Sequence, residues 1–378
     1  VVKSYVREDY EKVKFGRAAE DVCSDFTRAE KILALNAPLM QFCVFTVMIF
    51  VLYYGSYTII SSMGVDLDVG QLSALITYNF QILMSLMMLS MVFVMITMAS
   101  ESAHRIVEVL TEESSIQSPE NPVCQVQDGS IDFDNVSFKY SETAEKMALA
   151  DIDLHIKSGE TIGIIGGTGS SKSSLIQLIS RLYDATEGVV KVGGVDVRDY
   201  DLEVLRNQVA VVLQKNVLFS GTIKENLRWG NKNATDEEMI EACKLAQADE
   251  FISQFPQKYN TYIEQGGTNV SGGQKQRLCI ARALLKQPKV LILDDSTSAV
   301  DTKTDALIRK ALREYLPETT KIIIAQRTSS VEDADRILVM DGGTINAIGT
   351  HEELLKTSEI YREVYTSQNK AGGENDGE

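Results

Sequence analysis

Two adjacent carboxylates, Asp294 and Asp295, stand at the end of a short apolar run and could serve magnesium-dependent phosphate chemistry. The run Val290-Leu291-Ile292-Leu293 predicts a buried strand that ends at these acids. Beside a phosphate-binding loop, the first carboxylate is suited to hold Mg²⁺. The second would polarise an attacking water, a task for which glutamate has the longer reach. Because Asp295 is one methylene shorter, we expect a catalytic position with weakened reach.

A glycine-rich segment provides the phosphate-binding loop that this chemistry needs. It lies between the strand-like run 161–165 and an apolar helix start, and it consists of Gly166, Gly167, Thr168, Gly169, Ser170, Ser171, Lys172, Ser173 and Ser174. Backbone N–H groups at such a strand–loop–helix corner bind anions, helped by the helix dipole. Lys172 would reach the β- and γ-phosphates of ATP, and Ser173 would be a Mg²⁺ ligand. Serine at 171 departs from the glycine of the usual pattern, and a plain strand–turn–helix corner is the alternative.

These residues need a sheet with helices around it, and residues 130–368 carry that pattern. Runs rich in β-formers alternate there with amphipathic helical stretches, which predicts an α/β domain. A polar segment with two prolines, 113–129, predicts a linker. Residues 369–378 are Gly-rich and acidic, so we expect a disordered tail.

Residues 1–112 predict membrane helices. No Lys or Arg lies between Lys31 and Arg105, and two apolar stretches there indicate spans at about 33–63 and 71–98. A short acidic turn joins them, while basic residues flank the pair, which places both ends in the cytoplasm by the positive-inside rule. The alternative is a buried helical hairpin of a soluble protein. One face of the second span carries Met84, Met88, Met91, Met95 and Met98, suited either to helix packing or to a flexible wall for apolar ligands.

The composition narrows the classes of partner and of cysteine chemistry that the chain could have. A net charge of −16 over 378 residues argues against a nucleic-acid partner, which would require basic surface. The five cysteines have neither metal-ligand nor disulfide spacing. The first residues already have mid-helix character and no initiator Met, so we expect the chain to be the C-terminal part of a longer protein.

A third motif links the loop to the acids. The segment Val270-Ser271-Gly272-Gly273-Gln274 precedes a helical run that leads to the strand 290–293. In this combination the chain resembles the ATP-binding cassette (ABC) transporter family, whose signature begins with leucine where Val270 stands. The resemblance implies a multi-domain fold, with all-α transmembrane helices followed by an α/β P-loop NTPase domain. It further implies an integral protein of the cell membrane with its nucleotide domain in the cytoplasm.

The resemblance also implies roles for individual residues. Tyr140 corresponds to the aromatic residue that stacks on adenine, and Gln214 to the glutamine that senses Mg²⁺. Residues 298–301 match the D-loop that crosses a dimer of nucleotide domains. Residues 322–327 match the switch segment, but Gln326 stands where the family has histidine. The signature residues Ser271, Gly272, Gly273 and Gln274 would contact the ATP bound by a partner chain.

Asp295 and Gln326 both weaken this chain's own ATP site. A displacement of ~1 Å can cost about a hundredfold in rate, and glutamine has no titratable imidazole. Because the signature is nearly intact, we expect a heterodimer in which this chain holds ATP at a degenerate site and completes a hydrolytic site in a second ABC half-transporter. The resemblance points to efflux of amphipathic drugs or lipids, with membrane lipid as a further partner. The alternatives are a fully active homodimer, a non-hydrolysing regulatory subunit, and a soluble ABC ATPase, which the two spans oppose.

Overall fold

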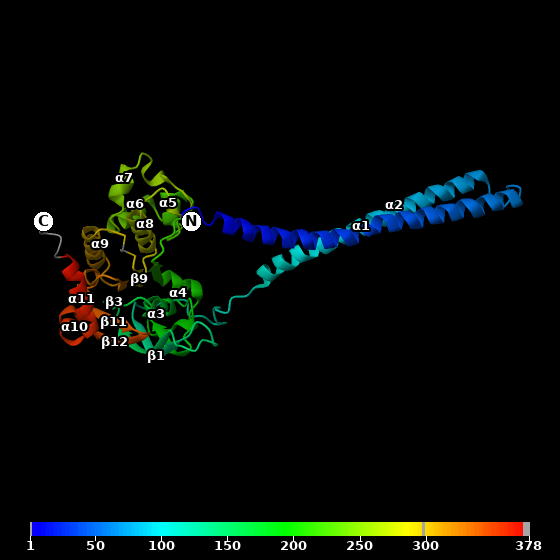
Figure 1. The fold of residues 1–378 in the computed structure, drawn as a ribbon. Helices are drawn as coiled ribbons and strands as arrows, with labels where there is room; N and C mark the ends of the chain where they lie inside the picture. Colours follow the sequence, from blue (N-terminus) through cyan, green and yellow to red (C-terminus); the bar gives the residue numbers. More distant parts are fainter. Residues whose placement is uncertain (1, 297–298, 373–378) are drawn as a thin grey trace. The chain divides into compact units, whose positions relative to one another are not determined.

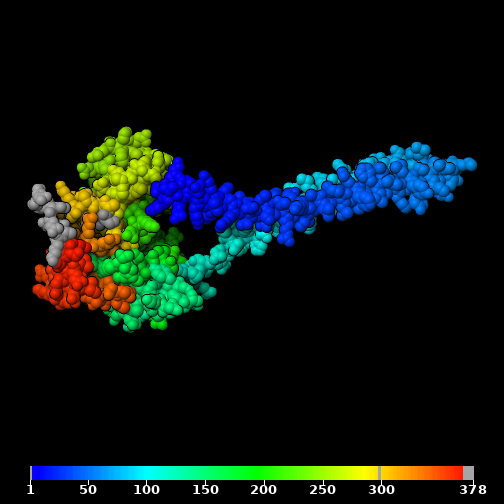
Figure 2. Space-filling view, viewed as in Figure 1, coloured from blue at the N-terminus to red at the C-terminus, as the bar shows by residue number. Residues whose placement is uncertain are grey.

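The computed structural model describes residues 2–296 and 299–372, which form two compact units divided between Glu113 and Ser114. The first unit consists of two long helices, α1 (Glu8–Ser61) and α2 (Val69–Thr111), which lie side by side (Figures 1 and 2). At 1.5 Å per residue, α1 is about 80 Å long. Each helix contains a window long and apolar enough to cross a membrane, and apolar side chains are exposed around both. Such all-round apolarity is typical of membrane helices.

Specific contacts join the two helices. The Asn36 side-chain amide donates to Ser90 Oγ at 2.8 Å. Gly55 is buried against α2, and a Cβ at this position would collide with the Leu72 side chain. The second helix begins at a capping box, in which Asp68 Oδ1 accepts from Gln71 N at 2.7 Å and Gln71 Oε1 accepts from Asp68 N at 3.0 Å. This cap explains why α2 begins two residues before the expected span.

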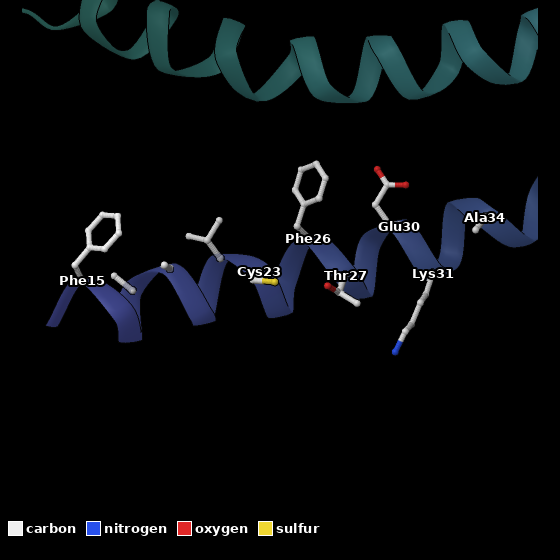
Figure 3. A pocket seen from close by; sticks show the side chains of 10 residues that line it. Phe15, Cys23, Phe26, Thr27, Glu30, Lys31 and Ala34 are labelled. Atoms are coloured by element: carbon white, nitrogen blue, oxygen red, sulfur yellow. The ribbon is translucent and has the colours of Figure 1, made fainter. Parts of the chain in front are cut away.

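An apolar groove of about 820 Å³ follows the N-terminal half of α1, where its lining runs from Phe15 to Ala34. Phe15, Phe26 and Glu30 point to one side of the helix, whereas Lys31 points to the other (Figure 3). Most of this lining precedes the first expected span, and only Ala34 lies within it.

The second unit is an α/β domain. Its strands are β1 (Ile131–Phe138), β2 (Leu149–Ile156), β3 (Thr161–Gly166), β4 (Glu187–Val192), β5 (Val195–Asp196), β6 (Val209–Val212), β7 (Gly221–Thr222), β8 (Tyr262–Ile263), β9 (Val290–Asp294), β10 (Thr320–Ile324), β11 (Arg336–Asp341) and β12 (Thr344–Gly349). Its α-helices are α3 (Lys172–Ile179), α4 (Leu202–Gln208), α5 (Ile223–Arg228), α6 (Asp236–Leu245), α7 (Asp249–Gln254), α8 (Gly272–Leu284), α9 (Thr302–Tyr315), α10 (His351–Thr357) and α11 (Glu359–Gly372). Short 3₁₀ turns are η1 (Val197–Asp199), η2 (Lys258–Asn260), η3 (Gln265–Gly267) and η4 (Thr328–Ser330).

The central sheet has six strands in the order β12-β11-β3-β10-β9-β6, and all neighbours are parallel except β12 and β11. Alternate residues of β9 enter two separate cores. Val290 and Ile292 pack with α3 and the antiparallel sheet β2-β1-β4-β5, whereas Leu291 and Leu293 pack with α6 and α8. Figure 1 shows α3 and α8 on opposite sides of these strands. Burial on both faces accounts for the uninterrupted apolar run.

Two segments differ from the expected boundaries. Part of the expected linker 113–129 packs on the second unit: Val126 is buried, and Val123 exchanges backbone hydrogen bonds with Asp199 and Asp201 at 2.8 and 3.1 Å. At the other end, α11 continues to Gly372, so residues 369–372 are helical where a disordered tail was expected. The rest of that tail, 373–378, lies outside the described residues. The expected fold class, membrane helices followed by an α/β P-loop domain, is confirmed.

Candidate nucleotide-binding site

Four neighbouring parallel strands deliver the predicted residues to one edge of the central sheet. In the register, Ile324 of β10 pairs with both Ile164 of β3 and Asp294 of β9, so the loops that follow these strands emerge together. Carboxyl ends of parallel strands are the usual place for ligands in such sheets. A pocket of about 530 Å³ lies there, lined by residues 165–174 together with Gln214, Asp294, Asp295, Ile324, Gln326 and Val364.

The loop 166–171 is tightly folded around small residues. Gly166 has no room for a side chain, because a Cβ would collide with the backbone of Met340. Gly169 has φ +84°, a left-handed conformation that glycine adopts without strain. Ser171 is also left-handed, with φ 67° and ψ 24°, and makes no side-chain cap to α3. The position that departs from the expected glycine therefore has a conformation that glycine favours.

Lys172 is held by the loop itself. Its Nζ donates to Gly166 O at 2.7 Å, to Gly167 O at 2.9 Å and to Ser170 Oγ at 3.1 Å. Burial lowers the pKa of Lys172, while the carboxylates of Asp294 and Asp295 oppose that shift. The ammonium group is thus fixed beside the two acids in the same pocket, where it can neutralise phosphate charge.

Ser173 and Asp294 form a pair of oxygen donors. Ser173 Oγ donates to Asp294 Oδ2 at 3.0 Å, and Asp294 is only 7% exposed. Burial raises the pKa of the Asp294 carboxyl, the Ser173 hydrogen bond lowers it, and the nearby Asp295 raises it. One carboxylate and one hydroxyl are oxygen donors that could hold Mg²⁺ beside bound phosphates. Among the described residues no cluster of three or more His, Cys, Asp or Glu could form a metal site of another kind.

Asp295 is held by two glutamines. Gln326 Nε2 donates to Asp295 Oδ2 at 2.8 Å, and Gln214 Nε2 donates to the same oxygen at 3.2 Å. The Asp295 backbone is left-handed, with φ 47°, and its N–H donates to Ile324 O at 2.9 Å. Burial raises the pKa of Asp295 more than the two amide donors lower it. Gln214, expected beside Mg²⁺, therefore contacts the second acid.

Tyr140 reaches the start of α3 but does not line the pocket. Its Oη lies 2.7 Å from Ser174 Oγ, and it donates to Gln177 Oε1 at 3.3 Å. The Tyr140 ring packs edge-on against Phe138 and Tyr183, with centroid distances of 4.8 and 5.2 Å. Tyr140 as a whole is 55% exposed, which leaves surface for a further stacking partner such as a base.

The signature residues lie apart from this pocket. Ser271 is the N-cap of α8, where Gln274 Oε1 accepts from Ser271 N at 2.9 Å. A Cβ on Gly273 would lie 2.9 Å from Ala299 O, and Ala299 N donates to Gln276 Oε1 at 3.0 Å. The described part of the expected D-loop thus packs on the signature helix, while Ser298 lies outside the described residues.

Two residues at the pocket, Val364 and Gln368, belong to none of the motifs predicted from the sequence. Val364 lines the pocket, and Gln368 donates to the backbone carbonyl of Gln326 at 2.7 Å. Both lie on α11, whose only signal in the sequence is amphipathic spacing.

Two protein-family models match the chain. A model of the ABC transporter transmembrane region matches residues 1–87, and the ABC transporter model matches residues 149–298. The uncharacterized ABC transporter ATP-binding protein YfiB of Bacillus subtilis is 38% identical over 368 residues, which is 97% of this chain and 63% of YfiB. YgaD of the same organism, an ATP-binding/permease protein provisionally named for multidrug export, is 36% identical over 370 residues, 98% of this chain and 63% of YgaD. The chain therefore spans less than two thirds of the length of these relatives.

A solved structure agrees with these matches. The structure of a bacterial Atm1-family ABC exporter with ATP bound has 31% sequence identity and a TM-score of 0.89, over 97% of this chain and 64% of that one. The helical unit is accordingly a transmembrane region, and the α/β unit is a cytoplasmic nucleotide-binding domain. The chain belongs to the ABC transporter family and has the fold of an exporter, with a transmembrane region followed by an ABC ATP-binding domain.

Proposed function

We propose that this chain is the ATP-binding subunit of an ABC exporter that couples ATP binding and hydrolysis to efflux of amphipathic drugs or lipids. We further propose that its own ATP site is degenerate and that it works in a heterodimer. The observation that carries the proposal is the Asp295 network, in which a short carboxylate accepts from Gln326 and Gln214 through one oxygen.

The pocket supports binding of ATP with Mg²⁺. The glycine loop and Lys172 would bind the phosphates, and Tyr140 offers an exposed ring for adenine. Ser173 and Asp294 would hold Mg²⁺, which neutralises phosphate charge when bound. Gln214 would act on the ATP site through Asp295, because its side-chain amide donates to that carboxylate.

Hydrolysis requires a group that positions the attacking water. Asp295 has a carboxylate, but its reach is one methylene short and Oδ2 already accepts two amide hydrogens. Gln326 has no proton to exchange near neutral pH. Both features favour long retention of ATP over turnover at this site.

The signature segment supports a role for this chain at the ATP site of a partner subunit. Ser271, Gly272, Gly273 and Gln274 form the N-terminus of α8, away from the pocket of this chain. In a dimer of nucleotide domains they would complete the ATP site of a second half-transporter, where hydrolysis would mainly occur. Across the membrane, exposed Met84, Met88, Met91, Met95 and Met98 on α2 support a polarisable wall for varied apolar substrates.

Restoration of the two residues tests the proposal. ATP turnover is measured for the purified full chain, for Asp295→Glu with Gln326→His, and for the same double variant with Lys172→Ala. We expect the double variant to gain about tenfold or more over the native chain, because the water-positioning geometry returns. Lys172→Ala should abolish the gain. Rapid hydrolysis by the native chain alone, with no gain on restoration, would support the fully active homodimer instead.

A further inference from the structure

The C-terminal helix α11 contacts the segment that follows β10 through Gln368. Gln368 Nε2 donates to Gln326 O at 2.7 Å, and Gln368 Oε1 accepts from Thr328 N at 2.9 Å and from Thr328 Oγ1 at 3.1 Å. One side-chain amide thus pairs with both a backbone C=O and a backbone N–H, as a neighbouring strand would. Gln368 thus hydrogen-bonds both ends of the backbone segment 326–328, although it lies 40 or more positions away in the sequence.

The same face of α11 is anchored in the core and reaches the pocket. Tyr361, Val364 and Gln368 have the i, i+3, i+7 spacing of one helical face. Tyr361 is fully buried, with its Oη 2.7 Å from His351 Nδ1, and Val364 lines the nucleotide pocket. Core packing therefore sets the position of this face, and Gln368 transmits that position to residues 326–328.

A second helix holds the other end of the segment. Ser330 Oγ donates to Asp305 Oδ2 at 3.0 Å, and Asp305 lies in the first turn of α9, which Asp301 caps. With α9 at Ser330 and α11 at Thr328, the 3₁₀ turn η4 is fixed from both sides. Gln326 precedes this turn, and its side chain extends to Asp295.

We propose that Gln368 is a positioning residue for the nucleotide site. It holds the backbone of 326–328 so that the Gln326 amide stays at the end of β10, within reach of Asp295 and of a terminal phosphate. This inference rests on the proposed ATP site and adds to it a control point on the C-terminal helix. Because a terminal phosphate is what distinguishes ATP from ADP, loss of Gln368 weakens binding of ATP more than binding of ADP.

The experiment compares binding of MgATP and MgADP to the full chain in lipid nanodiscs by titration calorimetry. Gln368→Met keeps the side-chain length and the helix propensity but removes both hydrogen-bonding groups. Ser367→Ala, at the exposed neighbour, is the control. For Gln368→Met we expect ATP affinity to fall about three- to tenfold, as for the loss of a neutral hydrogen-bond set. ADP affinity should be unchanged, and amide hydrogen exchange over residues 326–330 should increase.

A second variant separates the two contacts. Gln368→Glu can still accept from Thr328 but cannot donate to Gln326 O, so we expect a smaller loss of ATP affinity than in Gln368→Met. It also serves if Gln368→Met does not fold. An equal loss of ATP and ADP affinity, or native affinity and native exchange in a folded Gln368→Met, would overturn the proposed role. If the native chain binds no ATP, or if Lys172→Ala binds it equally well, the proposed ATP site fails instead, and the two failures are distinguishable.

Discussion

The side-chain amide of Gln326 donates to Oδ2 of Asp295 at 2.8 Å, so the two departures from the ABC family pattern that bear on hydrolysis are in direct contact. They lie 31 residues apart in the sequence and meet because β9 and β10 are neighbours in the sheet. A glutamine at 326 satisfies the short acid directly, which makes the two departures compatible with each other. Changing only one of them should therefore leave the other without its present partner.

The charged Asp294 carboxylate should lower the stability of the folded protein at neutral pH. Burial and the nearby Asp295 raise the pKa of the Asp294 carboxyl above its usual 3.8, so the folded protein binds this proton more tightly than the unfolded chain does. Stability is then lost as pH rises through the folded pKa and is regained as pH falls towards 3.8. Without Mg²⁺ at pH 7, we expect Asp294→Asn to raise Tm by about 2–4 °C, as for about 1 kcal/mol in a domain of this size.

Thermal unfolding in a chelator at several pH values checks this prediction. The advantage of Asp294→Asn should shrink as the pH is lowered, because the native carboxyl then becomes neutral as well. The same variant should lose the Mg²⁺-dependent part of ATP binding. A constant difference across pH would contradict the assigned cause.

Ser171 should be a point of backbone strain in the phosphate loop. Its left-handed φ of 67° costs a residue with a Cβ about 1 kcal/mol or more relative to glycine. Replacing Ser171 by glycine would relieve this strain, but part of the gain in stability is offset because the unfolded chain with glycine is more flexible. We expect Ser171→Gly to increase the free energy of unfolding by about 0.5–1 kcal/mol, measured by denaturant titration. Ser171→Ala keeps the Cβ and should give no gain, so equal effects of the two variants would exclude strain as the reason.

The helix pair of the membrane unit should depend on a small residue at position 55. A Cβ on Gly55 would collide with the end of the Leu72 side chain. We expect Gly55→Val to destabilise the pairing of α1 with α2 by about 1–3 kcal/mol, as in other overpacked contacts. The disulfide yield between Asn36→Cys and Ser90→Cys, which replace a hydrogen-bonded pair, reports the pairing.

A compensating change makes this test specific. Leu72→Ala removes the atoms that the new valine side chain would meet, so adding it to Gly55→Val should restore the disulfide yield. An undiminished yield in Gly55→Val alone would show that the contact is not needed.

Much of the fold was predictable because its signals are local. The apolar runs of β3, β9 and β10, the glycine loop and the two uncharged spans each have a pattern that a single segment specifies. The resemblance to the ABC family predicted that Lys172, Asp294 and Gln326 belong to one ATP site, and the register of β3, β10 and β9 shows how parallel strands bring them together.

The remainder depends on contacts between distant segments. The sequence of α11 does not indicate that Gln368 would bind the backbone of Gln326, because that contact exists only after Tyr361 packs in the core. The contact of Gln214 with Asp295 likewise depends on distant segments, because it arises where β6 and β9 are neighbours in the sheet. The left-handed backbone of Ser171 was visible only as a missing glycine.

Turnover of ATP by Asp295→Asn tests the central claim most directly. Asparagine has nearly the shape of aspartate and keeps one acceptor oxygen for the two glutamine amides, but it has no carboxylate to act as a base. If the site of this chain is degenerate, turnover by the purified full chain, with or without a partner half-transporter, should change less than about twofold, since Asp295 contributes little catalysis. A loss of about a hundredfold or more, of the size that removal of a general base produces, would contradict the account and show that Asp295 hydrolyses ATP at this site.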